Sequence, residues 1–198
     1  LPTEPHRHAS AIAAAEVLRR AGRGDQGLVL RVRKGLPLSG GQGGSAASAV
    51  AGAVAANVLL GWPLDEVAVL ASCLAAETAV AGRQADNLAP SLVGGAVLVR
   101  SLDPIDIVRL PCPALSIVLA RPEQRLRTAD ARAVLPGQLP RDLALQQAAN
   151  IAALVAALAS GDLALLGRAL DDRIAEPARA PFLPGFPAAR QAALDAGA

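Results

Sequence analysis

The sequence predicts an α+β protein built from two lobes. Apolar runs with helical spacing alternate with short strand-forming runs, and a glycine-rich segment separates the first strand from a long helix. Pro111-Cys112-Pro113 then interrupts the pattern. Neither proline can donate a hydrogen bond to a central sheet, so we place a boundary there, between a first lobe (1–110) and a second lobe (111–198).

In the first lobe, apolar spacing and the glycines that end each run predict helices over 6–20, 45–60 and 64–79. Alternating or β-branched apolar residues predict strands over 28–33, 94–99 and 106–110. The segment 80–90 is polar and rich in turn formers, and we expect a loop there.

In the second lobe, one apolar run predicts a strand over 115–119. Helical spacing predicts helices over 129–135, 143–159, 162–170 and 188–196. Strands mixed with helices in both lobes give the α+β class.

Composition excludes several classes of protein. Of 198 residues, 53% are hydrophobic and 18% charged, which argues against disorder. A net charge of +2 with 2% aromatic residues gives no surface suited to nucleic acid. The two cysteines, Cys73 and Cys112, form neither a zinc motif nor a disulfide framework, so we expect a reducing, cytoplasmic setting. The most apolar stretch, 46–60, is short for a membrane span, and we expect no membrane partner.

The segment 35–44 is the most informative part of the chain. It holds five glycines and a proline, follows a predicted strand and precedes a predicted helix. Main-chain N–H groups at such a helix start can bind an anion, and the helix dipole adds positive charge. We interpret the segment as a phosphate-binding loop; a tight turn without a ligand is the alternative.

Two common phosphate loops do not fit. The Walker pattern requires Gly-Lys-Ser/Thr, and Gly44-Ser45 lacks the lysine. The dinucleotide pattern requires an acidic residue at the end of the next strand, whereas Asp65 begins a predicted helix.

A third pattern fits. The segment 37–47 (PLSGGQGGSAA) resembles the Pro-x-x-x-Gly-Leu-Gly-Ser-Ser-Ala-Ala loop of the GHMP small-molecule kinases. Three further segments are similar to homoserine kinases within that superfamily. They are 85–90 (ADNLAP) followed by Gly94-Gly95, Thr128 and Arg132 followed by Leu135-Pro136, and 172–179 (DRIAEPAR) followed by 184–186 (PGF).

The resemblance implies a two-lobed GHMP kinase fold, with a lobe like ribosomal protein S5 domain 2 and a ferredoxin-like lobe. It also implies family strands before Leu1 and a second glycine-rich motif after Ala198, so we expect a central fragment, incomplete at both ends. The absence of methionine agrees with that expectation.

The implied activity is phosphorylation of the side-chain hydroxyl of L-homoserine with ATP and Mg²⁺, a step of threonine biosynthesis, by a homodimer. The resemblance assigns ATP binding to the loop residues Pro37, Gly40, Gly41, Gln42, Gly43, Gly44, Ser45 and Ala46. It assigns the metal to Ser45 and Glu77. Magnesium prefers few protein oxygens together with phosphates and waters, so one hydroxyl and one carboxylate suffice.

The resemblance also assigns the substrate. Asp86 would hold its amino group, Arg132 and Arg179 its carboxylate, and Gln84 stands where the family has a histidine. Asn87 would face the reacting hydroxyl, and Thr128 would lie beside substrate and phosphate, so these two are the expected catalytic residues. No general base is expected, because positioning and charge stabilisation serve a loose phosphoryl-transfer transition state.

Departures from the family pattern leave alternatives open. Gln42 and Gly44 replace leucine and serine, and Ala175 and Ala178 replace histidine and tyrosine. A kinase for another small alcohol, or an inactive kinase-like binding protein, would also fit these changes. A purely structural Ala-rich helical protein would leave the glycine loop unexplained.

Overall fold

The computed structural model describes residues 4–36, 41–120 and 128–197, without the side chains of the first two residues of the last range. The chain divides into two compact units, Leu1–Leu110 and Pro111–Ala198.

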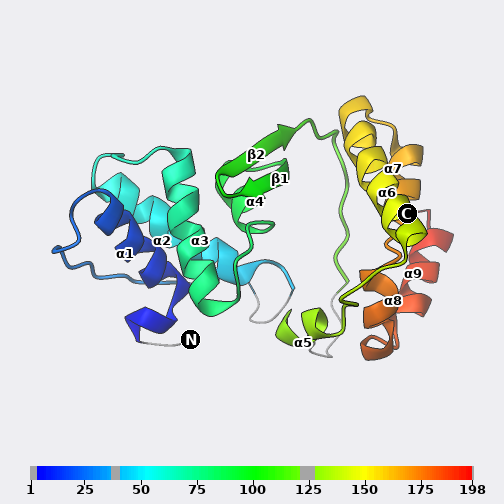
Figure 1. The fold of residues 1–198 in the computed structure, drawn as a ribbon, viewed down its shortest axis with the longest axis horizontal. Helices are drawn as coiled ribbons and strands as arrows, with labels where there is room; N and C mark the ends of the chain where they lie inside the picture. The colour runs from blue at the N-terminus through cyan, green and yellow to red at the C-terminus, as the bar shows by residue number, and fades with distance from the viewer. Residues whose placement is uncertain (1–3, 37–40, 121–127, 198) are drawn as a thin grey trace. The chain divides into compact units, whose positions relative to one another are not determined.

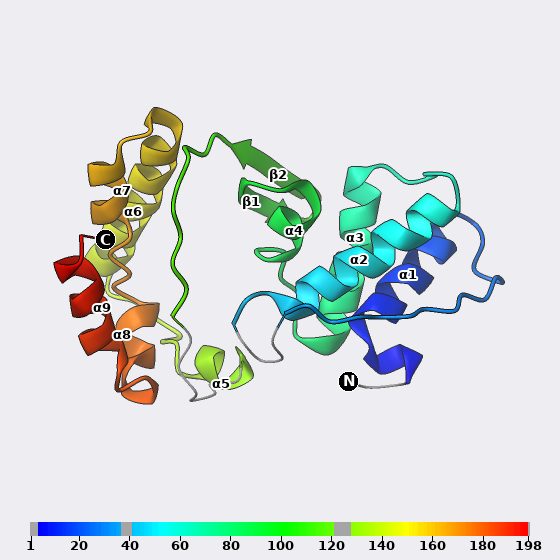
Figure 2. The ribbon, with the colours of Figure 1, turned by 180° about the vertical axis from the view of Figure 1, so that it is seen from behind.

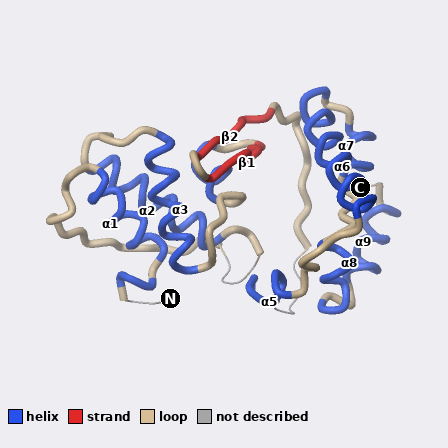
Figure 3. The backbone as a smooth tube through the Cα atoms, viewed as in Figure 1, coloured by secondary structure: helices blue, strands red, loops and turns tan. Residues whose placement is uncertain are grey.

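The first unit is a helical cluster with a β-hairpin (Figures 1 and 3). Its elements are the short 3-10 helix η1 (Pro5–Arg7), α1 (Ala9–Arg20), α2 (Gly44–Leu59), α3 (Glu66–Val80), α4 (Leu88–Val93), β1 (Ala96–Leu102) and β2 (Ile105–Leu110). Helices α1, α2 and α3 pack against one another, and α4 packs against α2, α3 and β1. The described part of the chain contains one sheet, in which β1 and β2 run antiparallel.

Small side chains let the three long helices come close together. Alanines of α1 and α2 and the larger Val17, Leu70 and Leu88 are buried in one core. The thiol of Cys73 belongs to this core, and burial raises its pKa to about 12, so it is neutral. The buried Asn57 joins α2 to the turn that precedes α3, because its amide bonds both the N–H and the C=O of Leu64, at 3.1 and 3.0 Å.

The boundaries of these helices follow local chemistry. Asp65 caps α3 by accepting a hydrogen bond from the N–H of Ala68 at 2.8 Å. The predicted helices over 45–60 and 64–79 are confirmed within two residues at each end. The predicted first helix is shorter than expected, since regular α-helix begins at Ala9. The predicted loop over 80–90 is wrong at its end, because Leu88, Ala89 and Pro90 begin α4.

The predicted strand over 28–33 is wrong. This segment is irregular and runs along α1 and α2 (Figure 2). Its residues alternate as a strand would, but no described strand lies beside it to complete a ladder. Val29 is 100% exposed as a result.

The second unit is helical in its described residues (Figure 3). Its elements are α5 (Thr128–Ala133), α6 (Arg141–Ser160), α7 (Leu163–Ala169), α8 (Ala175–Arg179), the 3-10 helix η2 (Ala180–Phe182) and α9 (Phe186–Asp195). The predicted strand over 115–119 is wrong, because this segment makes no ladder and Val118 is 93% exposed. Helix α8 is an element that the sequence patterns did not predict, since five residues are too few to show a helical period.

Helix α6 is the described helix whose length and apolar composition would suffice to cross a membrane. It also carries polar side chains that bond within the second unit. Asn150 donates to the C=O of Asp171 at 2.8 Å, and Gln147 accepts from the N–H of Arg173 at 3.2 Å. These bonds attach α6 to the turn that precedes α8.

Candidate functional site

The glycine loop leads directly into α2. Pro37 and Gly40 lie outside the described residues. Gly41 and Gly43 have φ angles of +69° and +66°, in the left-handed region that favours glycine. Gly43 is the N-cap residue, and no side chain caps the helix there. The start of α2 therefore offers its first main-chain N–H groups to an anion.

Gly43 is also the point where the loop meets Asn87. A Cβ atom at Gly43 would lie 3.1 Å from Oδ1 of Asn87, closer than such contacts usually are. Asn87 occupies the N-cap position of α4 but makes no capping hydrogen bond with its side chain. The structure thus places Asn87 against the loop, with the exposed Asp86 and the half-buried Gln84 in the same segment.

Ser45 and Glu77 contact each other at the start of α2, directly after the loop. Ser45 is exposed in the first turn of α2, and Glu77 is half-buried in the last turns of α3. The packing of α2 against α3 brings them together, and Ser45 Oγ donates to Glu77 Oε2 at 3.0 Å. A hydroxyl and a carboxylate at this spacing fit a magnesium ion that takes its other ligands from phosphates and water. Among the described residues, no group of three or more His, Cys, Asp or Glu side chains gathers elsewhere as a metal cage.

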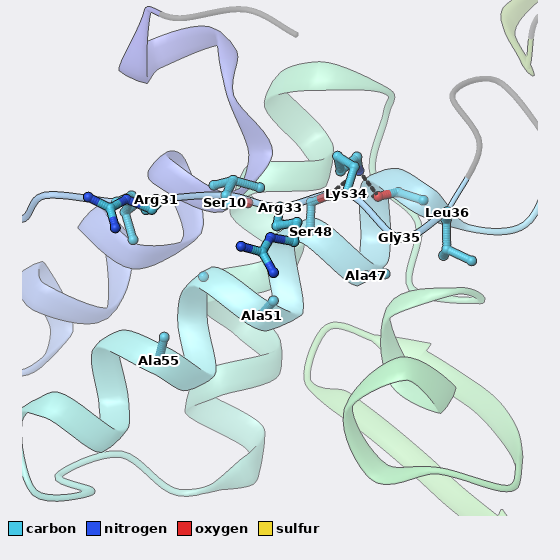
Figure 4. Close-up of a pocket in the computed structure, with 14 residues that line it drawn as sticks. Ser10, Arg31, Arg33, Lys34, Gly35, Leu36, Ala47, Ser48, Ala51 and Ala55 are labelled. Carbon is cyan, nitrogen blue, oxygen red and sulfur yellow. Dashed lines mark hydrogen bonds between the residues drawn. The ribbon is translucent and has the colours of Figure 1, made fainter.

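Lys34 is a site residue that sequence reasoning missed. Its Nζ donates to the C=O of Gly44 at 2.6 Å and to Oγ of Ser48, as Figure 4 shows. Ser48 Oγ donates to the same carbonyl at 2.7 Å. These bonds connect the segment before the loop to the first turn of α2. One signal was present in the sequence: Lys34 is the single lysine among 19 basic residues.

A pocket of about 370 Å³ adjoins the start of α2 (Figure 4). Its lining comes from three segments: the start of α1, residues 30–36 and the outer face of α2. Apolar or small side chains form most of the walls, including Leu30, Val32, Leu36, Ala47 and Ala51. Such a lining with a few polar groups is typical of small-molecule sites. No motif could reveal it, because the three segments are distant in sequence.

The remaining predicted residues lie in the second unit. Thr128 is the first residue of α5, and Arg132 is half-buried in the same helix. Arg179, the last residue of α8, donates from Nε to the C=O of Ala131 at 2.9 Å, so the two predicted arginines belong to neighbouring elements. Asp172 sets the start of α8 by accepting hydrogen bonds from the N–H groups of the next turn, at 2.9 and 2.8 Å.

The chain is similar in sequence and in structure to known proteins. The model of the GHMP kinases N-terminal domain matches residues 9–95, which include α1, the loop and Asn87. A homoserine kinase from Chlorobium phaeobacteroides is 41% identical over the whole chain. The crystal structure of a homoserine kinase from Cytophaga hutchinsonii superposes on 100% of this chain with a TM-score of 0.86 and 38% identity. Residues 9–95 of the chain are a GHMP kinase N-terminal domain.

The domain match and the superposition confirm the predicted α+β class with a GHMP kinase N-terminal domain. A homoserine kinase from Arabidopsis thaliana is 43% identical, again over the full chain. The chain spans 64% of the Chlorobium relative, 55% of the Arabidopsis relative and 63% of the Cytophaga structure.

Proposed function

We propose that this protein transfers the terminal phosphoryl group of ATP to the side-chain hydroxyl of L-homoserine, giving O-phospho-L-homoserine for threonine biosynthesis. The names of its relatives support the substrate. The contact of Ser45 with Glu77 beside the uncapped start of α2 carries the proposal, because it sets a metal-binding pair next to a phosphate-binding loop.

The phosphate groups are bound by main-chain N–H groups of the loop, with Gly43 and Gly44 keeping side chains out of their way. Ser45 and Glu77 would hold Mg²⁺, which would supply positive charge to neutralise the phosphates. The pocket beside α2 takes the nucleoside.

The amino-acid substrate is assigned to the other predicted residues. Asp86 binds its amino group, and Asn87 orients the hydroxyl for in-line attack. Arg132 and Arg179 bind the carboxylate, for which a guanidinium fork is well suited. The bond from Arg179 to Ala131 uses one of the five donors of its guanidinium and fixes its orientation.

ADP release in the presence of L-homoserine, L-serine and L-threonine tests the substrate. We expect the highest kcat/KM with homoserine. Equal rates with all three amino acids would contradict the assignment and favour a kinase for another small alcohol. ATP binding without turnover on any of them would favour an inactive binding protein.

The metal pair gives a second test. We expect Ser45→Ala and Glu77→Gln each to raise the Mg²⁺ concentration needed for half-maximal rate by at least about tenfold, because the first removes a ligand oxygen and the second removes the negative charge that attracts the ion. Glu66→Gln is the control: it makes the same charge change at the other end of α3, where Glu66 pairs with Arg109. An unchanged magnesium dependence in both test variants would contradict the metal assignment.

A further inference from the structure

The loop 81–87, between α3 and α4, connects two parts of the proposed site. It begins one helical turn after Glu77 and ends at Asn87, which lies against the glycine loop. Its first N–H groups, those of Ala81 and Gly82, both donate to the C=O of Glu77, at 2.8 and 3.0 Å. The placement of Asn87 relative to Glu77 therefore depends on the conformation of this loop.

Arg83 attaches the middle of the loop to the turn of the β-hairpin. Its Nη2 donates to the C=O of Leu102 at 3.1 Å and lies 3.6 Å from Oδ2 of Asp103. Leu102 and its cross-strand partner Ile105 pack against the core of the first unit, so the acceptor is well anchored. The Asp103 side chain is 89% exposed, and water weakens its attraction for the guanidinium. The bond to Leu102 is therefore the stronger of the two contacts.

This contact affects the local path of the loop more than the stability of the fold. Ala85 and Leu88 are buried and already attach the end of the loop to the core. Arg83 is exposed, and exposed polar contacts contribute little to the free energy of unfolding. The bond restricts instead the residues that follow Arg83, which include Asp86.

We propose that Arg83 is a positioning residue for the amino-acid substrate, and that its bond to the hairpin turn holds Asp86 and Asn87 toward that substrate. This inference rests on the proposed function, which assigns the amino group of the substrate to Asp86 and its hydroxyl to Asn87. A displacement of about 1 Å at a group that orients a substrate lowers the rate strongly. A contact outside the site thus has a measurable effect on catalysis.

Steady-state kinetics of Arg83→Met in the whole chain, with each substrate varied in turn, tests the proposal. Methionine keeps an unbranched side chain and removes every donor. We expect kcat/KM for L-homoserine to fall about tenfold, with the KM for ATP and the magnesium dependence unchanged. Arg83→Lys should recover part of the loss, because an ammonium can still donate to the Leu102 carbonyl. Asp103→Asn should resemble the wild type, because the main-chain acceptor remains.

Arg100→Met is the matched control. Arg100 pairs with Asp106 within the same hairpin, and the side chains of Arg83 and Arg100 are 51% and 66% exposed. Neither residue of the Arg100 pair belongs to the loop 81–87, so its loss should leave kcat/KM for homoserine unchanged.

Hydrogen exchange of the ligand-free chain gives a readout that needs no activity. We expect the amides of residues 83–87 to exchange faster in Arg83→Met and at the wild-type rate in Arg100→Met, with similar melting temperatures for both variants. Unchanged exchange, or a wild-type kcat/KM in Arg83→Met, would overturn the proposal while leaving the proposed function intact. Equal rises in the KM for ATP and for homoserine would overturn it too. Wild-type protein that phosphorylates none of homoserine, serine and threonine would overturn the proposed function and this inference together.

Discussion

Lys34 places a positive charge at the start of α2, which is unfavourable when no anion is bound there. The start of a helix carries partial positive charge, and the Lys34 ammonium bonds to the Gly44 carbonyl in the first turn of α2. A bound triphosphate would turn this arrangement into a favourable one, since the ammonium and the helix dipole would then face the same anion. We infer that Lys34 is a positioning residue, which holds residues 30–36 against α2 and raises the positive potential of the loop.

Replacing Lys34 by methionine keeps most of the side-chain volume and removes the charge. We expect the KM for ATP to rise about tenfold, with a smaller effect on kcat and an unchanged KM for homoserine. Steady-state kinetics with each substrate varied in turn measures this. We expect Lys34→Arg to restore little, because a planar guanidinium does not place one donor between Gly44 O and Ser48 Oγ.

Arg23→Met is the control for a general loss of positive charge, since Arg23 is exposed and outside the pocket lining. If Arg23→Met changed the KM for ATP as much as Lys34→Met does, the specific role of Lys34 would be wrong.

At the scale of elements, the crossing of α1 over α2 depends on Gly52. The α1 backbone occupies the place of a side chain at this position, because a Cβ atom on Gly52 would overlap Ser10 O and lie 2.7 Å from Ser10 Cα. Backbone atoms of a helix cannot turn aside as a flexible side chain can. A larger residue must therefore push the two helices apart.

We expect Gly52→Ala to lower the free energy of unfolding of the first unit by about 3 kcal/mol, the upper end of the usual cost of overpacking. Scanning calorimetry measures the change. Gly167→Ala is the control, because Gly167 lies within α7 with nothing within 4 Å of a Cβ, and the gain in helix propensity there should stabilise the second unit by up to about 1 kcal/mol. If Gly52→Ala left the free energy of unfolding unchanged, α1 and α2 would pack less tightly than the structure shows.

The two segments wrongly predicted as strands share one physical cause. Residues 28–33 and 115–119 have the composition of strands, but a strand is stable only when a neighbour satisfies its N–H and C=O groups. In the hairpin, β1 and β2 are close in sequence and each is the other's neighbour. The positions of both strands were predicted within three residues. Local pattern thus located the hairpin, whereas pairing between distant segments could not be read from sequence.

At the scale of the whole molecule, both of these extended segments are exposed to a protease. Val29 is 100% exposed in the first unit, and Ile117, Val118 and Leu119 are 73–93% exposed in the second. Irregular exposed backbone can enter a protease active site, and buried helices cannot. The two segments differ in one respect: residues 30–36 line the pocket, and 115–119 do not.

We therefore expect brief treatment with subtilisin to cut the chain within 28–33 and within 115–119, and saturating MgATP to protect only the first of these segments. Mass spectrometry of the fragments measures both effects. Cleavage within α1, α2 or α3 at the same rate would contradict the compact first unit. Equal protection of both segments would argue against a local effect of nucleotide at the pocket.

The sequence by itself determined the class of fold, the long helices and the loop over 35–44, because helical spacing, caps and glycines act over a few residues. It also pointed to Ser45, Glu77 and Asn87, through a resemblance that spans four ordered segments. Only the tertiary structure decided that Ser45 meets Glu77 and that Lys34 bonds the first turn of α2. Each of these depends on the close packing of helices that are distant in the chain, and that packing is set by long-range burial which no local pattern encodes.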